Sequence, residues 1–512
     1  MACNSPGPEG QETTAGSTDP VDAVTEPLGR SAAVGTLWLT GQKWIVRVSG
    51  FVTIAVLTRL IAPADFGVVA AASTITPMVL LLADLGLSTY IVQAKDVDSR
   101  ILSTGFWFSV TAGTVLAVGL ALLAPLIADA FNIEGSAAVL RAMSLSVLIT
   151  VVSSVPIALM RRRMLFRLLA IQGAAAAIAA QTVAVVVALA GGGAWALVAQ
   201  LLVGQAVIGT LAWRSAGWVP RREFSARLFA SMAQFGIKVV AVDIVATIRV
   251  TLEAAIISNA LGAAALGYLS IAQRLVMTAQ DVGATALVPV SMVVFAKIRD
   301  SRERLRAGYL RALRIGYAAV SPILTFVAVG APLIIPLVFG KGWEPAIPVA
   351  QALAIAAILV LGAMIDHGLH YGVGAPGRWF AYALGIDVLT VASTAVLAPR
   401  GLTWVAVGFV AVALVATIAR WVLVGRLVGC PPWVLAGGFM VAMVPVVASA
   451  GAGIAVRVAA NGLPALLAVT IVGATVVIVH LVVVRLVSRR VLAETLDVLP
   501  IPQRFAGIRR LV

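Results

Sequence analysis

The sequence predicts an all-α polytopic membrane protein with about fourteen transmembrane helices, in two six-helix lobes followed by two C-terminal helices. The first observation is composition, because the 512 residues are 61% hydrophobic and only 12% charged, with a mean hydropathy of +1.03. The second is that apolar stretches long enough to cross a bilayer recur from about Val34 to Leu486. The third is that the loops between these stretches carry most of their arginines on one side. This pattern excludes a soluble enzyme.

The predicted spans fall into ordered groups along the chain. Residues 1–31, rich in small, polar and acidic residues, lack the features of a signal peptide and predict a disordered cytoplasmic tail. A basic linker at 214–227 separates the N-lobe (32–213) from the C-lobe (228–426), and 427–487 holds two accessory spans before a basic tail at 488–512. The spans are 32–62, 65–94, 101–128, 136–160, 166–190, 194–213, 228–260, 264–295, 307–339, 345–373, 377–398, 402–426, 432–457 and 463–487.

The distribution of loop charges predicts that both termini face the cytoplasm. Basic residues crowd the loops on the N-terminal side, whereas the opposite side holds only Arg141, Lys341, Arg400 and Arg457. The net charge of +15 therefore lies beside membrane spans, where anionic lipid head groups supply the counter-charge. Membrane lipids, and not nucleic acid, are the expected partners of these arginines.

An internal repeat relates the two predicted lobes. The segment at residues 59–67 resembles the segment at 259–267, and each is a tight turn between the first and second spans of its lobe. Because each lobe has an even number of spans, both begin on the same side of the membrane, which makes this a parallel repeat. Two such lobes facing each other predict a central cleft.

Ionisable residues at membrane depth concentrate in the first two spans of each lobe. Each costs roughly 2.5 to 3.5 kcal/mol on insertion scales, so each needs an explanation. Lys43 and Arg47 are four residues apart and share a helix face, a two-cation patch that suits a phosphate. The predicted substrate-binding residues are Lys43, Arg47, Arg249 and Arg274, and the predicted coupling-ion residues are Asp84, Asp243, Glu253 and Asp281.

A structural interpretation of the same charges stays open. Arg249 and Glu253, four residues apart, and Arg274 and Asp281, seven apart, could neutralise each other inside the C-lobe.

No phosphate-binding loop of the GxxxxGK[ST] type is present, so ATP-driven export by this chain alone is excluded. The outer loops are too short for an obvious catalytic site, and we expect neither an enzyme nor a cofactor or metal.

Several segments carry a family resemblance. Residues 57–67 (LTRLIAPADFG), 84–88 (DLGLS), 103–107 (STGFW), the triple arginine within 156–166, and 339–343 (FGKGW) resemble Wzx-type polysaccharide flippases. These flippases are similar to the broader multidrug, oligosaccharidyl-lipid and polysaccharide exporter superfamily, and the resemblance covers nearly the whole chain after residue 32. The chain departs from the pattern at Arg249 and Glu253, where the family often has Asn and Asp.

The resemblance implies a function in the bacterial cytoplasmic membrane. A flippase of this kind moves a polyprenyl-pyrophosphate-linked oligosaccharide, a cell-envelope polysaccharide precursor, from the cytoplasmic to the outer leaflet by alternating access. Its expected partners are the lipid-linked substrate and a polysaccharide polymerase or glycosyltransferases. Two alternatives stay open, an ion-coupled multidrug or cation exporter and a non-transporting scaffold of a polysaccharide-assembly complex; bases at least equal to acids in the cleft favour an anionic substrate over a cation.

Overall fold

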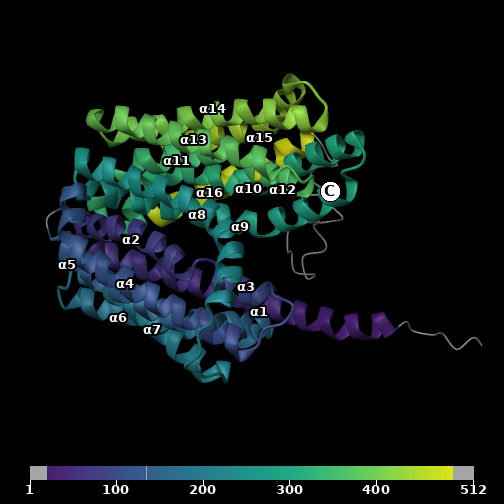
Figure 1. Ribbon diagram of the computed structural model, residues 1–512. Coiled ribbons are helices and arrows are strands. Elements are labelled where there is room, and N and C mark those ends of the chain that lie inside the picture. Colours follow the sequence, from purple (N-terminus) through teal and green to yellow (C-terminus); the bar gives the residue numbers. More distant parts are fainter. Residues whose placement is uncertain (1–19, 134, 488–512) are drawn as a thin grey trace, which may run out of the picture.

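A computed structural model describes residues 20–133 and 135–487, and within these ranges it contains helices and no strand. The long helices run roughly side by side in one bundle (Figure 1), with α1–α7 on one side and α9–α16 mainly on the other, while α8 packs against helices of both groups. The first group comprises α1 (Pro20–Leu60), α2 (Pro63–Asp84), α3 (Leu87–Gln93), α4 (Ser99–Phe131), α5 (Ser136–Arg162), α6 (Phe166–Leu189) and α7 (Ala194–Ala216). The second comprises α8 (Ala226–Leu261), α9 (Ala263–Ile298), α10 (Arg302–Phe339), η1 (Lys341–Trp343), α11 (Ala346–Val360), α12 (Ala363–Gly372), α13 (Pro376–Leu397), η2 (Ala398–Arg400), α14 (Leu402–Val428), α15 (Pro432–Ala459) and α16 (Ala465–Val487).

The all-α membrane class is confirmed. Twelve helical segments of the described residues are long and apolar enough to cross a membrane. They correspond to predicted spans other than 32–62 and 264–295, which lie in the continuous helices α1 and α9. The total of fourteen spans and the division into lobes stay predictions.

The beginning of α1 differs from the expected tail. The helix starts at Pro20, so α1 includes residues 20–31 of the segment predicted as a cytoplasmic tail. A proline is well accommodated at the start of a helix because its fixed φ suits the first turn and its missing N–H has no partner there. The remainder of the predicted tail, residues 1–19, lies outside the described residues, as does the C-terminal tail at 488–512.

Two of the predicted spans are broken helices. The span at 65–94 divides into α2 and α3 at Leu85 and Gly86, whose φ angles are +45° and +70°. At this break α8 approaches closely, since a Cβ built on Gly236 would lie 1.8 Å from the carbonyl oxygen of Leu85. The span at 345–373 divides into α11 and α12 near Gly362, where a Cβ would lie 2.6 Å from an Nη of Arg420. In both places a glycine makes room for a neighbour that a larger residue would displace.

The two repeat segments contact each other reciprocally. A Cβ built on Gly67 would lie 1.7 Å from the carbonyl oxygen of Ala263, and one built on Gly267 would lie 2.1 Å from that of Pro63. The same two positions of the repeat therefore meet across α2 and α9, as expected for an axis that passes between them. Small residues allow this close approach of two membrane helices.

The indole of Trp343 packs beside the two repeat segments. Its Nε1 donates a hydrogen bond to the carbonyl oxygen of Thr58 at 2.8 Å. Its ring packs edge-on against Phe66 and Tyr268, with centroids 5.1 and 5.9 Å away. Trp343 thus joins α1, α2 and α9, which gives the FGKGW segment a structural role.

A buried ion pair stabilises the helices of the predicted C-lobe. Arg420 of α14 contacts Asp366 of α12 at 2.8 Å, and both side chains are almost fully buried at 3% and 0% exposure. The hydroxyl of Tyr309 in α10 donates a hydrogen bond to the other carboxylate oxygen at 2.6 Å. The ion pair and the hydrogen bond of Tyr309 join α10, α12 and α14. Because each buried charge has a partner, the partner's attraction offsets part of the desolvation cost.

Candidate functional site

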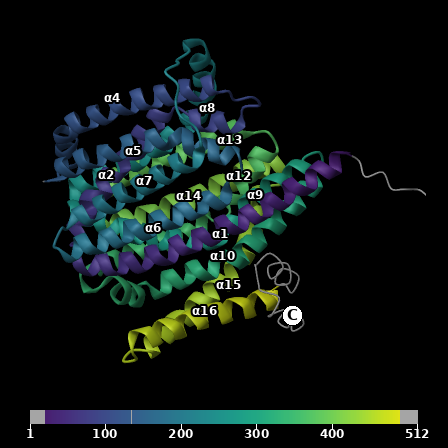
Figure 2. The same ribbon diagram turned by 90° about the horizontal axis from the view of Figure 1, so that it is seen from below.

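A cavity of about 600 Å³ lies between α1, α6 and α9. Adjoining cavities of about 570 and 700 Å³ extend it towards α2 and α7 and towards α8. Arg274 lines all three cavities, so they meet at its side chain. Seen from below (Figure 2), α1 crosses between α6 and α10, with α9 close by. The three cavities lie between helices of the first group and helices of the second group, and the cleft between two lobes stays a prediction.

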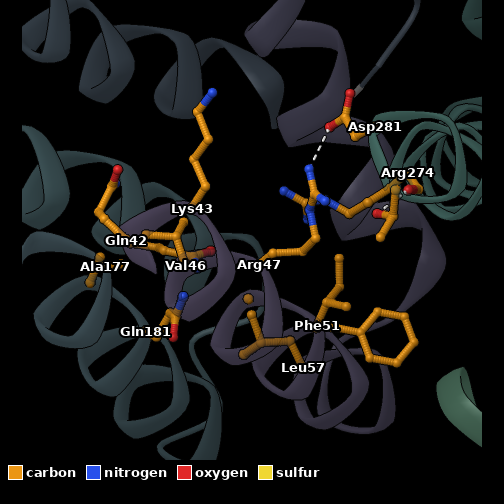
Figure 3. A pocket seen from close by; sticks show the side chains of 15 residues that line it. Gln42, Lys43, Val46, Arg47, Phe51, Leu57, Ala177, Gln181, Arg274 and Asp281 are labelled. Carbon is orange, nitrogen blue, oxygen red and sulfur yellow. Dashed lines mark hydrogen bonds and ion pairs between the residues drawn. The ribbon is translucent and has the colours of Figure 1, made fainter. Parts of the chain in front are cut away.

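The cavity between α1, α6 and α9 carries an excess of positive charge. Its described lining includes three basic side chains, Lys43, Arg47 and Arg274, and one acidic side chain, Asp281. In Figure 3 the side chains of Lys43 and Arg47 extend from α1 into the cavity, and Arg274 points in from α9. The predicted two-cation patch of α1 is thus joined by a third cation from the other half of the chain.

Arg47 forms an ion pair between the two halves of the chain. Its guanidinium contacts the carboxylate of Asp281 at 3.2 Å, and the indole of Trp44 lies beside it, with the ring centroid 5.4 Å from Cζ. The alternative pairing of Asp281 with Arg274 is wrong, because α1 supplies the partner instead. The Asp281 side chain is 62% exposed and that of Arg47 is 22% exposed. Such a water-accessible pair is weak, so Arg47 can exchange its partner.

Lys43 and Arg274 have no ion-pair partner among the residues that the structure describes. Both side chains are exposed and line the cavity. A ligand with two or more negative charges would pair with groups that are otherwise unmatched.

A second charged cluster borders the cavity on α8. Arg249 contacts Glu253 one turn along the same helix, and its Nε lies 3.0 Å from Oδ1 of Asp387 in α13. The pairing of Arg249 with Glu253 that the sequence suggested is confirmed. Because two carboxylates share this guanidinium, Arg249 is less available to an anionic ligand than Lys43 or Arg274.

The four predicted coupling acids do not form one site. Glu253 and Asp281 line the cavity next to α8 and α9. Asp84 lies at the end of α2, where its carboxylate accepts a hydrogen bond from the Ser88 hydroxyl at 2.6 Å. Asp243 is exposed on α8 and lines none of the three cavities.

Amide side chains complete the lining and were not predicted from the sequence. Gln42, Gln181 and Gln200 line the cavity from α1, α6 and α7. The sequence could have indicated these residues, because a glutamine within an apolar span must find a hydrogen-bonding partner or an aqueous surface. Amides can donate to sugar hydroxyls or to phosphate oxygens, which extends the chemistry of the cavity beyond charge.

Comparison with known proteins identifies the family. A family model described as polysaccharide biosynthesis protein matches residues 56–348. The succinoglycan biosynthesis transport protein ExoT of Rhizobium meliloti is 27% identical over 346 residues, which cover 67% of this chain and 70% of the relative. The lipopolysaccharide biosynthesis protein WzxC of Escherichia coli is 27% identical over 333 residues, covering 63% and 67%.

Solved structures share the fold. The lipid II flippase MurJ in an inward closed conformation matches with a TM-score of 0.73 at 11% identity, covering 89% of this chain and 99% of MurJ. An inward-facing multidrug transporter of the MATE family matches with a TM-score of 0.61 at 16% identity, covering 75% and 94%. The matching family model, together with the relatives ExoT and WzxC, confirms the family resemblance expected from the sequence. The chain belongs to the polysaccharide biosynthesis protein family of Wzx-type flippases.

Proposed function

We propose that this protein is a flippase that moves a polyprenyl-diphosphate-linked oligosaccharide, a precursor of a cell-envelope polysaccharide, between membrane leaflets by alternating access. The observation that carries the proposal is the excess of three basic over one acidic side chain in the cavity. Unpaired charges at membrane depth are expensive and mark a substrate pathway. A diphosphate supplies the negative charge that this lining lacks.

The named functions of the relatives support the same class of substrate. ExoT is named for transport in succinoglycan biosynthesis, and WzxC for lipopolysaccharide biosynthesis. A third relative, TuaB of Bacillus subtilis, is named for teichuronic acid biosynthesis and is 23% identical over 328 residues. The sugars of these products differ, whereas a phosphorylated lipid carrier would offer each transporter the same anionic group. Lys43, Arg47 and Arg274 are the residues that we propose bind that shared group, because all three line the cavity.

The ion pair of Arg47 with Asp281 supplies a link between binding and movement. A ligand shifts a conformational equilibrium only if it contacts the two states differently. A diphosphate that takes Asp281's place on Arg47 removes a contact between α1 and α9 and replaces it with its own bonds to both helices. Of the four acids proposed for ion coupling, Glu253 and Asp281 are the two that line the adjoining cavity of about 700 Å³, which favours them over Asp84 and Asp243.

The proposed orientation places both termini in the cytoplasm of a bacterium and the chain in the cytoplasmic membrane, with transport from the cytoplasmic to the outer leaflet. Its support is the excess of arginines on one set of loops. The protein acts as a transporter and not as an enzyme in this proposal. A polysaccharide polymerase or glycosyltransferases are its proposed protein partners, because they would use or supply the lipid-linked substrate.

Depletion of the protein in its native host tests the function. Leaflet-selective labelling followed by mass spectrometry should show a lipid-linked glycan that accumulates on the cytoplasmic side. Re-expression of the wild type should reverse the accumulation, and a Lys43→Gln/Arg47→Gln double variant, at matched membrane levels, should not. Arg141→Gln, a change at an exposed arginine outside the cavity, serves as the matched control. Altered drug sensitivity without any accumulated glycan would favour a drug exporter and contradict the proposal.

A further inference from the structure

An apolar groove lies on the outside of the bundle, between α1 and α6. It has a volume of about 320 Å³, and its lining includes Trp38, Gly41 and Ile45 from α1 and Ile171 and Ala174 from α6. Trp38, Ile45 and Ile171 are large apolar side chains that are 43–51% exposed. In a membrane-spanning bundle such a surface faces lipid, so the groove is open to the acyl region of the bilayer.

The groove and the cationic cavity are separated by a single helix. Gly41 and Ile45 are four residues apart and share one face of α1, whereas Lys43 and Arg47 share another. Positions two residues apart on an α-helix are rotated by about 200°, so these two faces point in nearly opposite directions at the same depth. A lipid whose diphosphate binds Lys43 and Arg47 therefore lies at the same depth as the groove, which is on the opposite face of α1.

Gln42 lies between the two compartments. It lines the groove and also both of the cavities next to α1. Its amide lies against the backbone of α6, because a Cβ built on Gly173 would be 2.4 Å from Nε2. Gln42 thus fills the contact between α1 and α6 that separates the groove from the cavities.

The end of the groove at Trp38 carries residue types that are typical of a membrane interface. The guanidinium of Arg167 packs over the ring of Trp38, 5.3 Å from its centroid. Tryptophan and arginine of this kind are typical of the head-group level. The groove runs along α1 from Trp38 to Ile45, over about 10 Å of helix.

We propose that this groove holds the polyprenyl chain of the lipid-linked substrate while its diphosphate occupies the cationic cavity. The inference rests on the proposed function and assigns a binding site for the second half of the substrate. Because lipid and groove are both apolar, the chain gains affinity there from close packing against the groove. The groove also gives the chain a path in which it stays in apolar surroundings while the charged group leaves the leaflet surface.

The test fills the groove and compares two probes. Gly41→Phe places a ring in the groove from a position where a Cβ meets no atom within 4 Å, and Gly119→Phe in α4 is a matched control with the same free space. Purified protein in lipid nanodiscs is titrated with a long-chain polyprenyl diphosphate and with inorganic pyrophosphate. Gly41→Phe should weaken binding of the polyprenyl diphosphate by at least about fivefold and leave pyrophosphate binding unchanged. Gly119→Phe should alter neither.

Photo-crosslinking identifies the occupant directly. A benzophenone amino acid replaces Ile171 in the groove, or Ile178 on the same helix as a control that is exposed but does not line the groove. Crosslinks at Ile171 to a radiolabelled polyprenyl diphosphate, absent at Ile178 and lost in Gly41→Phe, support the proposal. Equal crosslinking at both sites, or crosslinking only to bulk phospholipid, overturns it.

The two proposals fail in distinguishable ways. If wild-type protein binds neither pyrophosphate nor polyprenyl diphosphate, the proposed function fails, and the assignment of the groove fails with it. If both probes bind and Gly41→Phe weakens neither, the groove assignment is wrong while the diphosphate site stands.

Discussion

Substitutions at the two ends of the Arg47–Asp281 ion pair should have opposite effects on anion binding. Arg47→Gln removes a cation from the cavity, whereas Asp281→Asn removes the acid that competes for it. If the pair were a structural tie alone, the two changes would act in the same direction. Opposite changes in anion affinity in the two variants would therefore indicate a binding role for the pair, and changes in the same direction would indicate a structural role.

The size of each effect follows from the geometry. A hydrogen bond to a charged group is worth about 1.5 to 3 kcal/mol, so Arg47→Gln should weaken pyrophosphate binding by roughly 10- to 100-fold. Asp281 is 62% exposed, and an exposed ion pair contributes about 0.2 to 1 kcal/mol. Releasing Arg47 from this pair should therefore strengthen pyrophosphate binding only by about 1.5- to 5-fold.

Isothermal titration of purified protein with pyrophosphate at low salt measures both effects. Arg141→Gln and Asp129→Asn are matched controls, because both residues are exposed and neither lines the cavity. Both controls should bind pyrophosphate as the wild type does. Weaker binding in Asp281→Asn, or unchanged binding in Arg47→Gln, would refute the proposed competition for Arg47.

Three further predictions concern binding and stability. Lys43→Gln should weaken pyrophosphate binding by roughly 10-fold in the same titration, since the cation has no other partner among the described residues, and unchanged binding would remove it from the site. Asp366→Asn should cost about 3 to 5 kcal/mol of stability, because it leaves the charge of Arg420 buried without compensation; a thermal unfolding curve in detergent that matches the wild type would contradict this role. Gly67→Ala should reduce the yield of folded protein in size-exclusion chromatography, because its Cβ would lie 1.7 Å from a carbonyl oxygen of α9, whereas Gly119→Ala meets no atom within 4 Å and should fold normally.

The sequence contains enough information for the class of fold and for the basic residues that line the cavity. Lys43, Arg47 and Arg274 stand out because ionisable residues are rare within apolar spans, and all three line the cavity. The resemblance of residues 59–67 to residues 259–267 also had a structural basis, because the two segments pack against each other.

The pairing of charges could not be predicted in the same way. Arg47 and Asp281 are 234 residues apart, and Arg249 meets Asp387 from a different helix. Rules for one helix consider partners three or four residues away and are silent on partners across the bundle. Which acid meets which base depends on helix packing.

The helix breaks have a similar cause. The segment at 65–94 is predominantly apolar, so it predicts one span, yet it bends at Leu85 and Gly86 where α8 approaches. Close backbone contact between helices decides such breaks, and hydropathy does not record it. The groove between α1 and α6 likewise depends on the packing of Gly173 against Gln42.

Transport in reconstituted vesicles tests the central claim most directly. Purified protein is placed in liposomes with a fluorescent glycan linked to a long-chain polyprenyl diphosphate, and a membrane-impermeant quencher reports the fraction in each leaflet over time. We predict that wild-type protein moves the lipid between leaflets and that Lys43→Gln/Arg47→Gln protein, reconstituted to the same density, does not. Equal movement by the double variant, or no movement by the wild type across all glycans and ion gradients tried, would contradict a diphosphate-binding cavity as the basis of function.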